Sequence, residues 1–170
     1  MRRRIYWIGA AMAALLVIPA AAAQAGEEKV ALDKVPRPVA EAVKARFKDA
    51  KVTGAAKETV DGKTVFEITI QDHGRNVDVT LHPDGELALI EREITRNELP
   101  QPAGSALSNK YPKATYKIVE EITKVEKKRE TLAYYEVLLV TAQKQALEVQ
   151  VAADGKILQE ERKDLEKEDK

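Results

Sequence analysis

The chain has 170 residues, of which 44% are hydrophobic and 33% are charged. This hydrophobic fraction excludes a disordered or low-complexity chain. The 28 basic residues balance 28 acidic ones, and a zero net charge argues against a nucleic-acid binder, which needs a basic face to contact phosphates. We therefore expect no nucleic-acid partner.

Residues 1–25 predict a signal peptide. Three arginines at positions 2–4 precede an apolar run over 5–18, and Pro19 interrupts that run. Ala23-Gln24-Ala25 has the small-x-small pattern that signal peptidases accept, so we expect cleavage after Ala25 and a periplasmic or secreted location. The alternative is a retained anchor, because the apolar segment is close to the shortest length that spans a bilayer. After cleavage no membrane anchor remains, and the chain has no cysteine for a disulfide or a lipid.

The rest of the chain matches itself at an offset of 64 to 70 residues. Three motifs recur in the same order: Val-Pro-Arg-Pro at 35–38 and Leu-Pro-Gln-Pro at 99–102, Phe-Glu-Ile at 66–68 and Tyr-Glu-Val at 135–137, and Asp-Gly at 84–85 and 154–155. This order predicts two tandem repeats, over 35–95 and 99–162. The growing offset requires inserted residues, which we expect in an exposed turn near 125–130. Residues 26–34 are expected to be an exposed segment, and 163–170 a charged tail.

Each repeat is predicted to be a helix packed on a roughly four-stranded antiparallel sheet, which makes the fold class α+β. In the first repeat, helical spacing of apolar residues predicts a helix, and alternation predicts the strands that follow it. The expected order is a helix over 38–47, a weaker strand over 51–60, strands over 64–71 and 77–81, a turn at 82–85, and a strand over 87–93.

The second repeat departs from the first in its helix and in one strand. The helix expected over 102–111 contains poor helix formers, including Gly104. The strand expected over 134–140 is largely apolar on both faces, because Leu138 and Val140 lie on the face opposite Val137.

These features resemble the PepSY-like family. The resemblance rests on a Leu/Val-Pro opening, a short helix ending in an aromatic residue, a Tyr/Phe-Glu-Val/Ile strand, and Asp-Gly before a final strand; it covers 35–93 and 99–162. That family is described as similar in fold to the beta-lactamase-inhibitor protein, a tandem repeat that presents a concave sheet to an enzyme. The resemblance implies a binding or inhibitory role in an exported protein, with no catalytic residues to carry over. Unlike that inhibitor, this chain has no disulfides to brace its repeats.

We expect no enzymatic activity. Nucleophilic hydrolysis needs a Ser, Thr or Cys beside a base. The only serines, Ser105 and Ser108, lie on the predicted second helix, and the only histidines, His73 and His82, lie in turns of the first repeat, so a catalytic pair would have to form across the two repeats. Carboxylate pairs at 91/93 and 120/121 are interpreted as solvated strand charges, because no apolar pocket is indicated and the members of the second pair point to opposite faces.

We also expect no metal and no cofactor. His73 and His82 flank one predicted strand and would lie about 30 Å apart along it, too far to share an ion. The Asp-Gly pairs at 61, 84 and 154 are explained by tight turns, without a bound cation.

The candidate partner surface lies on the outer face of the second sheet. Leucines and a valine would form an apolar patch there, rimmed by polar side chains: Leu132, Leu138 and Val140, with Glu136, Glu148 and Gln150. The alternative is intramolecular burial, either by packing of two sheets or within one continuous sheet.

We therefore predict an exported, non-catalytic module that binds another envelope or secreted protein, as an inhibitor or modulator of a periplasmic or secreted enzyme. The alternative function is a small-ligand carrier that uses the concavity between the two repeats.

Overall fold

The computed structural model describes residues 28–60 and 62–163, so the predicted signal peptide and the end of the charged tail lie outside the described residues. Its elements are, in chain order, β1 (Glu28–Lys29), the 3-10 helix η1 (Leu32–Lys34), α1 (Arg37–Arg46), β2 (Lys51–Val60), β3 (Lys63–Asp72), β4 (Arg75–Leu81), β5 (Leu87–Glu93), the 3-10 helix η2 (Arg96–Glu98), α2 (Gln101–Lys110), β6 (Thr115–Glu126), β7 (Arg129–Val140), β8 (Ala146–Val151) and β9 (Ile157–Lys163). The predicted α+β class is confirmed. Within the described ranges, no helix combines the length and apolarity needed to cross a membrane.

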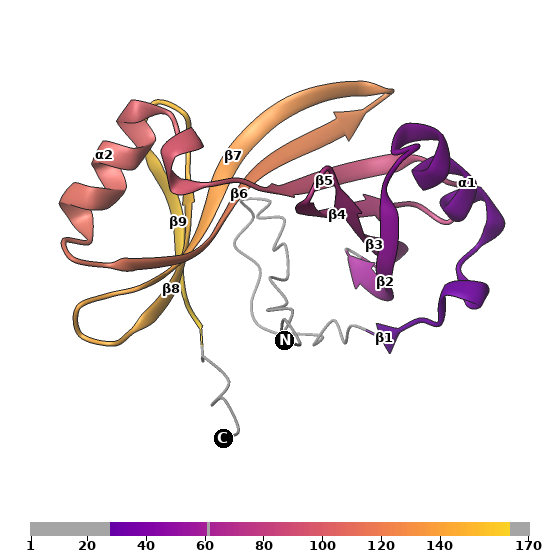
Figure 1. Cartoon of the computed structure of the whole chain (residues 1–170), viewed down its shortest axis with the longest axis horizontal. Helices are drawn as coiled ribbons and strands as arrows, with labels where there is room; N and C mark the ends of the chain where they lie inside the picture. Colours follow the sequence, from indigo (N-terminus) through magenta and orange to yellow (C-terminus); the bar gives the residue numbers. More distant parts are fainter. Residues whose placement is uncertain (1–27, 61, 164–170) are drawn as a thin grey trace.

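The strands form one antiparallel sheet in which each strand pairs with its neighbours in sequence, in the order β1 to β9. The two halves of the chain join where β5 pairs with β6, with Glu91 opposite Ile122. In Figure 1 the two helices lie near opposite ends of the long axis, with β5, β6 and β7 between them. The strands predicted for the two repeats are therefore parts of a single continuous sheet.

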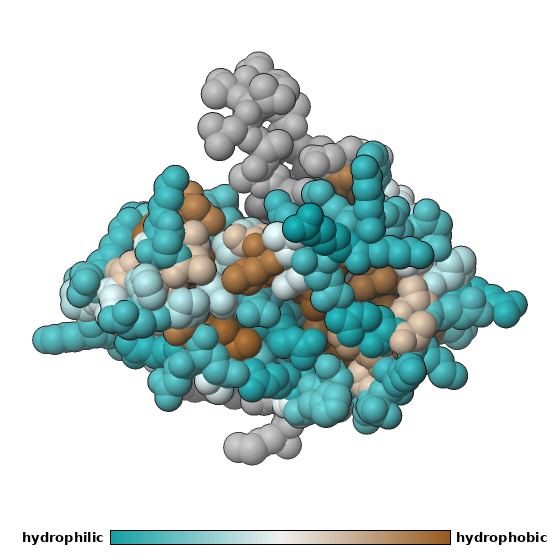
Figure 2. All heavy atoms as spheres, turned by 90° about the horizontal axis from the view of Figure 1, so that it is seen from above, coloured by the Kyte–Doolittle hydropathy of each residue, from teal (hydrophilic) through white to brown (hydrophobic). Residues whose placement is uncertain are grey.

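Both helices pack on the same face of this sheet. The first core joins α1 to β2–β5 and includes Ile90, and the second joins α2 to β6–β9 and includes Val119. Ile90 pairs with Thr123, which lies on the same side of β6 as Val119 because alternate strand residues share a face. Seen from above (Figure 2), hydrophilic residues dominate the surface, and apolar ones show in small separate patches.

The helices form for different local reasons. In α1, Val39 and Val43 supply the buried stripe, and prolines occupy the start, where a missing N–H costs nothing. In α2, Gly104 and other poor formers lower the intrinsic propensity, but Ala103 and Leu107 are fully buried against the sheet. Tertiary packing therefore outweighs propensity in α2.

The same turn geometry occurs in both halves of the chain. Gly85 and Gly155 have φ of +90° and +91°, and a Cβ on either would lie 2.6 Å from a helix-start carbonyl oxygen, that of Pro38 or Pro102. Both the backbone conformation and the close approach require glycine. The Asp-Gly turns predicted at 84 and 154 therefore also pack closely against the first turns of α1 and α2.

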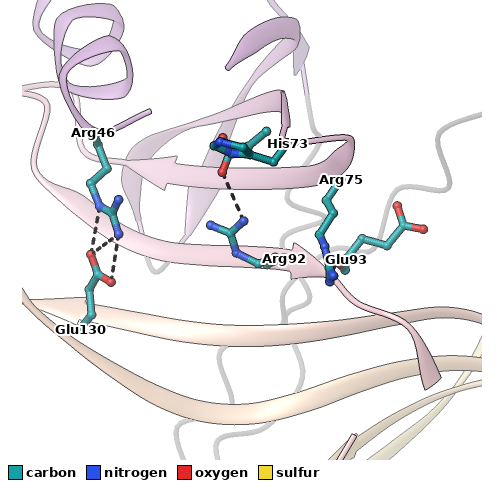
Figure 3. Close-up of polar contacts among 7 residues, drawn as sticks. Arg46, His73, Arg75, Arg92, Glu93 and Glu130 are labelled. Atoms are coloured by element: carbon teal, nitrogen blue, oxygen red, sulfur yellow. Dashed lines mark hydrogen bonds and ion pairs between the residues drawn. The ribbon is translucent and has the colours of Figure 1, made fainter. Parts of the chain in front are cut away.

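The extra residues of the second half lengthen a hairpin. β6 and β7 have 12 residues each, against 10 in β2 and β3, and Lys127 and Lys128 form the turn with positive φ. The expected location of the inserted residues near 125–130 is confirmed, because residues 126–130 form an exposed hairpin end. The residues on either side of the Lys127–Lys128 turn pair as strand instead of forming a longer loop. The longer hairpin reaches the first half, where Val125 packs against the first core and Arg46 pairs with Glu130 at 3.0 Å (Figure 3).

Candidate binding face

The face of the sheet opposite α1 and α2, here called the helix-free face, carries buried polar side chains. They alternate along the strands with the core residues, so strand periodicity directs them away from the helices. Those less than a tenth exposed are Glu67, Thr69, Glu91, Glu120, Glu136, Glu148 and Gln150. Acidic residues are rarely buried without a compensating partner, so this face requires a physical explanation.

Strand register places three of its carboxylates side by side. Glu93 of β5 pairs with Glu120 of β6, and Glu120 pairs with Glu136 of β7. We call these three residues the carboxylate row. Adjacent strands are about 4.8 Å apart, and like charges placed directly opposite each other destabilise a sheet. The row therefore works against folding whenever its members are ionised.

Amide side chains from the flanking strands hold the two ends of the row. Asn76 of β4 donates from Nδ2 to Glu93 Oε2 at 2.5 Å, and Gln150 of β8 donates from Nε2 to Glu136 Oε2 at 3.0 Å. Glu120 lies between them, and its Oε2 is buried with no hydrogen-bond partner among the described residues. The central carboxyl is thus the least satisfied member of the row.

In the part of the chain that the structure describes, Glu136 of the row and Glu148 beside it are each satisfied through one oxygen only. Glu136 uses Oε2 for Gln150, and its Oε1 has no partner within 28–60 and 62–163. Glu148 of β8 contacts Lys163 Nζ through Oε1 at 3.2 Å, and in the same part of the chain its Oε2 has no partner. Each side chain is therefore oriented by one oxygen, while the other oxygen is buried and has no hydrogen-bond partner among the described residues.

Burial and mutual repulsion shift the titration of this face. Desolvation, followed by the charges of Asp78 and Glu136, raises the pKa of Glu120 to about 8. Desolvation and Glu148 raise the pKa of Glu136 to about 7, and the Gln150 hydrogen bond opposes that shift. Burial also raises the pKa of Glu91 well above its ordinary value, with Glu120 the largest charge contribution. Glu120 and Glu136 therefore change their protonation state near neutral pH.

Charged groups on the helix side of the sheet are paired instead. Arg92 contacts the Asp72 carboxylate at 3.2 Å, and His73 Nδ1 lies 2.8 Å from the same side chain (Figure 3). Arg75 forms two hydrogen bonds with Glu98, at 2.9 and 3.0 Å. These contacts differ from those of the helix-free face, where acids lie opposite other acids.

The structure brings together five of the six residues predicted for the partner surface. Glu136 pairs with Gln150 and Leu138 pairs with Glu148, and Val140, which is half-buried, pairs with Ala146 at the next position of the same face. These five side chains form one patch on β7 and β8 of the helix-free face. Leu138 is only 4% exposed, which leaves little of the apolar surface that was expected.

The sixth predicted residue, Leu132, lies apart from this patch. Leu132 is 42% exposed and pairs with Thr123, beyond a register shift that follows the Ile122–Tyr134 pair. That shift is a β-bulge, which moves Leu132 out of the alternation that Leu138 follows.

The interpretation of the strand carboxylates as solvated is wrong for two of them. Glu91 is 4% exposed and Glu120 is 7% exposed. Alternation with apolar residues correctly predicted the face on which each carboxylate lies within its own strand. Glu121, as predicted, points to the face opposite Glu120. The sequence held no signal for the register that aligns them with acids on other strands.

Two of the residues considered for catalysis, Ser108 and His73, make local hydrogen bonds. Ser108 Oγ donates to the Gly104 carbonyl at 2.7 Å and accepts a hydrogen bond from Arg96 at 3.1 Å. His73 lies in the β3–β4 turn against Asp72. Among the described residues, no group of three His, Asp or Glu side chains has the arrangement of a metal site.

Comparison with solved structures identifies the fold. A BLIP-like protein from Bacteroides fragilis matches 74% of this chain and 84% of its own at 16% identity, with a TM-score of 0.56. A predicted periplasmic protein from Bacteroides eggerthii matches 75% and 88% at 16% identity, and a DUF2874 family protein from Bacteroides uniformis matches 75% and 88% at 15% identity, each with a TM-score of 0.59. No family model matches the chain, and a search of curated proteins finds no match. The chain therefore has a BLIP-like fold, and identities this low show the fold alone.

Proposed function

We propose that this protein is an exported, non-catalytic binding module, built from two PepSY-like tandem repeats, that recognises another envelope or secreted protein through its helix-free face. The observation that carries the proposal is a set of buried carboxylates on that face, at Glu120, Glu136 and Glu148, each with an oxygen that has no partner among the described residues. Gln150 and Lys163 orient Glu136 and Glu148 through their other oxygens. A buried acceptor without a partner costs free energy. A docking partner that supplies donors removes this cost.

Repeated geometry supports the tandem origin. Gly85 and Gly155 make equivalent contacts with the helix starts at Pro38 and Pro102, and each half is a helix on an antiparallel meander. The predicted signal peptide and the likeness to a predicted periplasmic protein support export. The likeness to a BLIP-like protein favours a role as an inhibitor or modulator of an enzyme.

Site-specific cross-linking tests this function, because the chain contains no cysteine. Glu161→Cys and Arg162→Cys place a thiol on adjacent, exposed residues of β9 that point to opposite faces. Each variant, beginning at Gly26, is labelled with a benzophenone maleimide and irradiated in an envelope extract of the source organism. We expect the label at 161, on the helix-free face, to capture a defined protein that the label at 162 does not. Equal capture from both positions, or none from either, would contradict the proposal.

The small-ligand carrier is a separate outcome of the same work. A thermal-shift screen with lipids, dyes and metals would raise the unfolding temperature if such a ligand binds the folded state. If a small molecule stabilises the protein and no face-specific cross-link forms, the carrier function would replace the protein-binding function.

A further inference from the structure

We infer that the helix-free face takes a cationic segment of a protein partner, whose lysine or arginine side chains donate to the unpartnered oxygens of Glu120, Glu136 and Glu148. The inference rests on the proposed function and adds the chemistry of the partner. The unpartnered acceptors and the charge of the surrounding groups support it independently.

The carboxylate oxygens that have no partner among the described residues require a ligand with hydrogen-bond donors. Glu136 is 2% exposed and Glu148 is 4% exposed, and each keeps one oxygen without a partner in the described part of the chain. Gln150 and Lys163 fix the orientation of these side chains through the other oxygen. An ammonium carries three N–H donors and a guanidinium five, so either group can satisfy carboxylates on neighbouring strands at once.

The groups that surround Glu120 favour a positively charged ligand. Acidic side chains approach it from β4, β5, β7 and β8, and they are Asp78, Glu91, Glu93, Glu136 and Glu148. Lys163 of β9 contacts the edge of this cluster, at Glu148 and Glu161. A cation placed at the centre replaces repulsion among acids by attraction.

Two apolar side chains adjoin the acids on the same face. Ile122 lies between Glu91 and Tyr134 in the strand register, and Leu138 lies beside Glu148. Both are almost fully buried, so a partner would contact the carboxyls and not these side chains. Among the described residues no group of three acids has the arrangement of a metal site, which favours a basic protein segment over a compact inorganic cation.

Binding would also displace protons. Carboxyls that share protons near neutral pH must ionise to receive a cation, so association should release protons to solvent and weaken as the pH falls. Calorimetry in two buffers of different ionisation enthalpy counts the protons released.

The experiment uses pentalysine as the probe. Its affinity is measured by isothermal titration calorimetry for the chain beginning at Gly26 and for a Glu120→Gln, Glu136→Gln variant. An Asp49→Asn, Glu86→Gln variant removes two charges from exposed positions outside the sheet and serves as the matched control. Circular dichroism establishes that each variant is folded.

We expect the row variant to bind pentalysine about tenfold more weakly than wild type, and the control to stay within about twofold. Equal affinities for wild type and the row variant would overturn the inference. Spermidine binding as tightly as pentalysine would overturn it in favour of a free polyamine. Face-specific cross-linking from position 161 without pentalysine binding would retain the proposed function and reject only the cationic partner.

Discussion

Replacing Glu120 by glutamine removes the titration of the central carboxyl in the row while nearly keeping its shape. In the folded protein its pKa is raised to about 8, from an ordinary 4.5. The folded state therefore binds more protons than the unfolded state between these two values, and stability falls as pH rises through this window. Below it both states are protonated, and above it the full destabilisation is present.

The size of the effect follows from the same two values. Each pKa unit corresponds to about 1.4 kcal/mol, so raising the pH from about 5 to about 8 should lower the free energy of unfolding by about 3 kcal/mol through Glu120. The glutamine variant lacks this loss. We expect it to resemble wild type at about pH 5 and to be more stable by about 3 kcal/mol at about pH 8.

Urea unfolding followed by circular dichroism at a series of pH values measures this difference. Glu121→Gln is the control, because Glu121 is the next residue of β6 and points to the helix side of the sheet. Parallel pH profiles for wild type and the Glu120 variant would refute the reasoning, because they would show that the carboxyl is not held in a repelling, desolvated site. A variant that is less stable at every pH would show that a favourable interaction had been removed.

Three further predictions concern contacts elsewhere in the fold. Gly85→Ala should lower the free energy of unfolding by about 2 kcal/mol, because its φ of +90° and the 2.6 Å approach to a carbonyl oxygen both exclude a Cβ; urea unfolding unchanged by the substitution would contradict this. A double-mutant cycle on Arg46 and Glu130 should give a coupling below about 1 kcal/mol that salt diminishes, because both side chains are over 40% exposed, and a larger, salt-insensitive coupling would be inconsistent with that exposure. Hydrogen bonds from Arg75 lower the pKa of Glu98 to about 2, so an NMR titration of Arg75→Ala should move that pKa upward, and an unmoved value would argue against the contact.

The sequence by itself determined the elements and their faces. Helical spacing located α1, alternation located β3 and β4, and the Asp-Gly turns marked the hairpins, because these signals depend on residues close together in the chain. The antiparallel α+β class followed from the same local patterns. Glu136, Glu148 and Gln150 were also correctly given a common face, since alternation within β7 and β8 needs no tertiary information.

Only the tertiary structure decided which side chains meet across strands. The alignment of Glu93, Glu120 and Glu136 depends on hairpin lengths and on bulges, and the bulge that separates Leu132 from Leu138 has no clear local signal. A shift of one residue in register moves every side chain to the other face. Cross-strand register is therefore the physical reason why three acids from separate strands lie in one row, in which Glu120 and Glu136 are buried and Glu93 is half-buried.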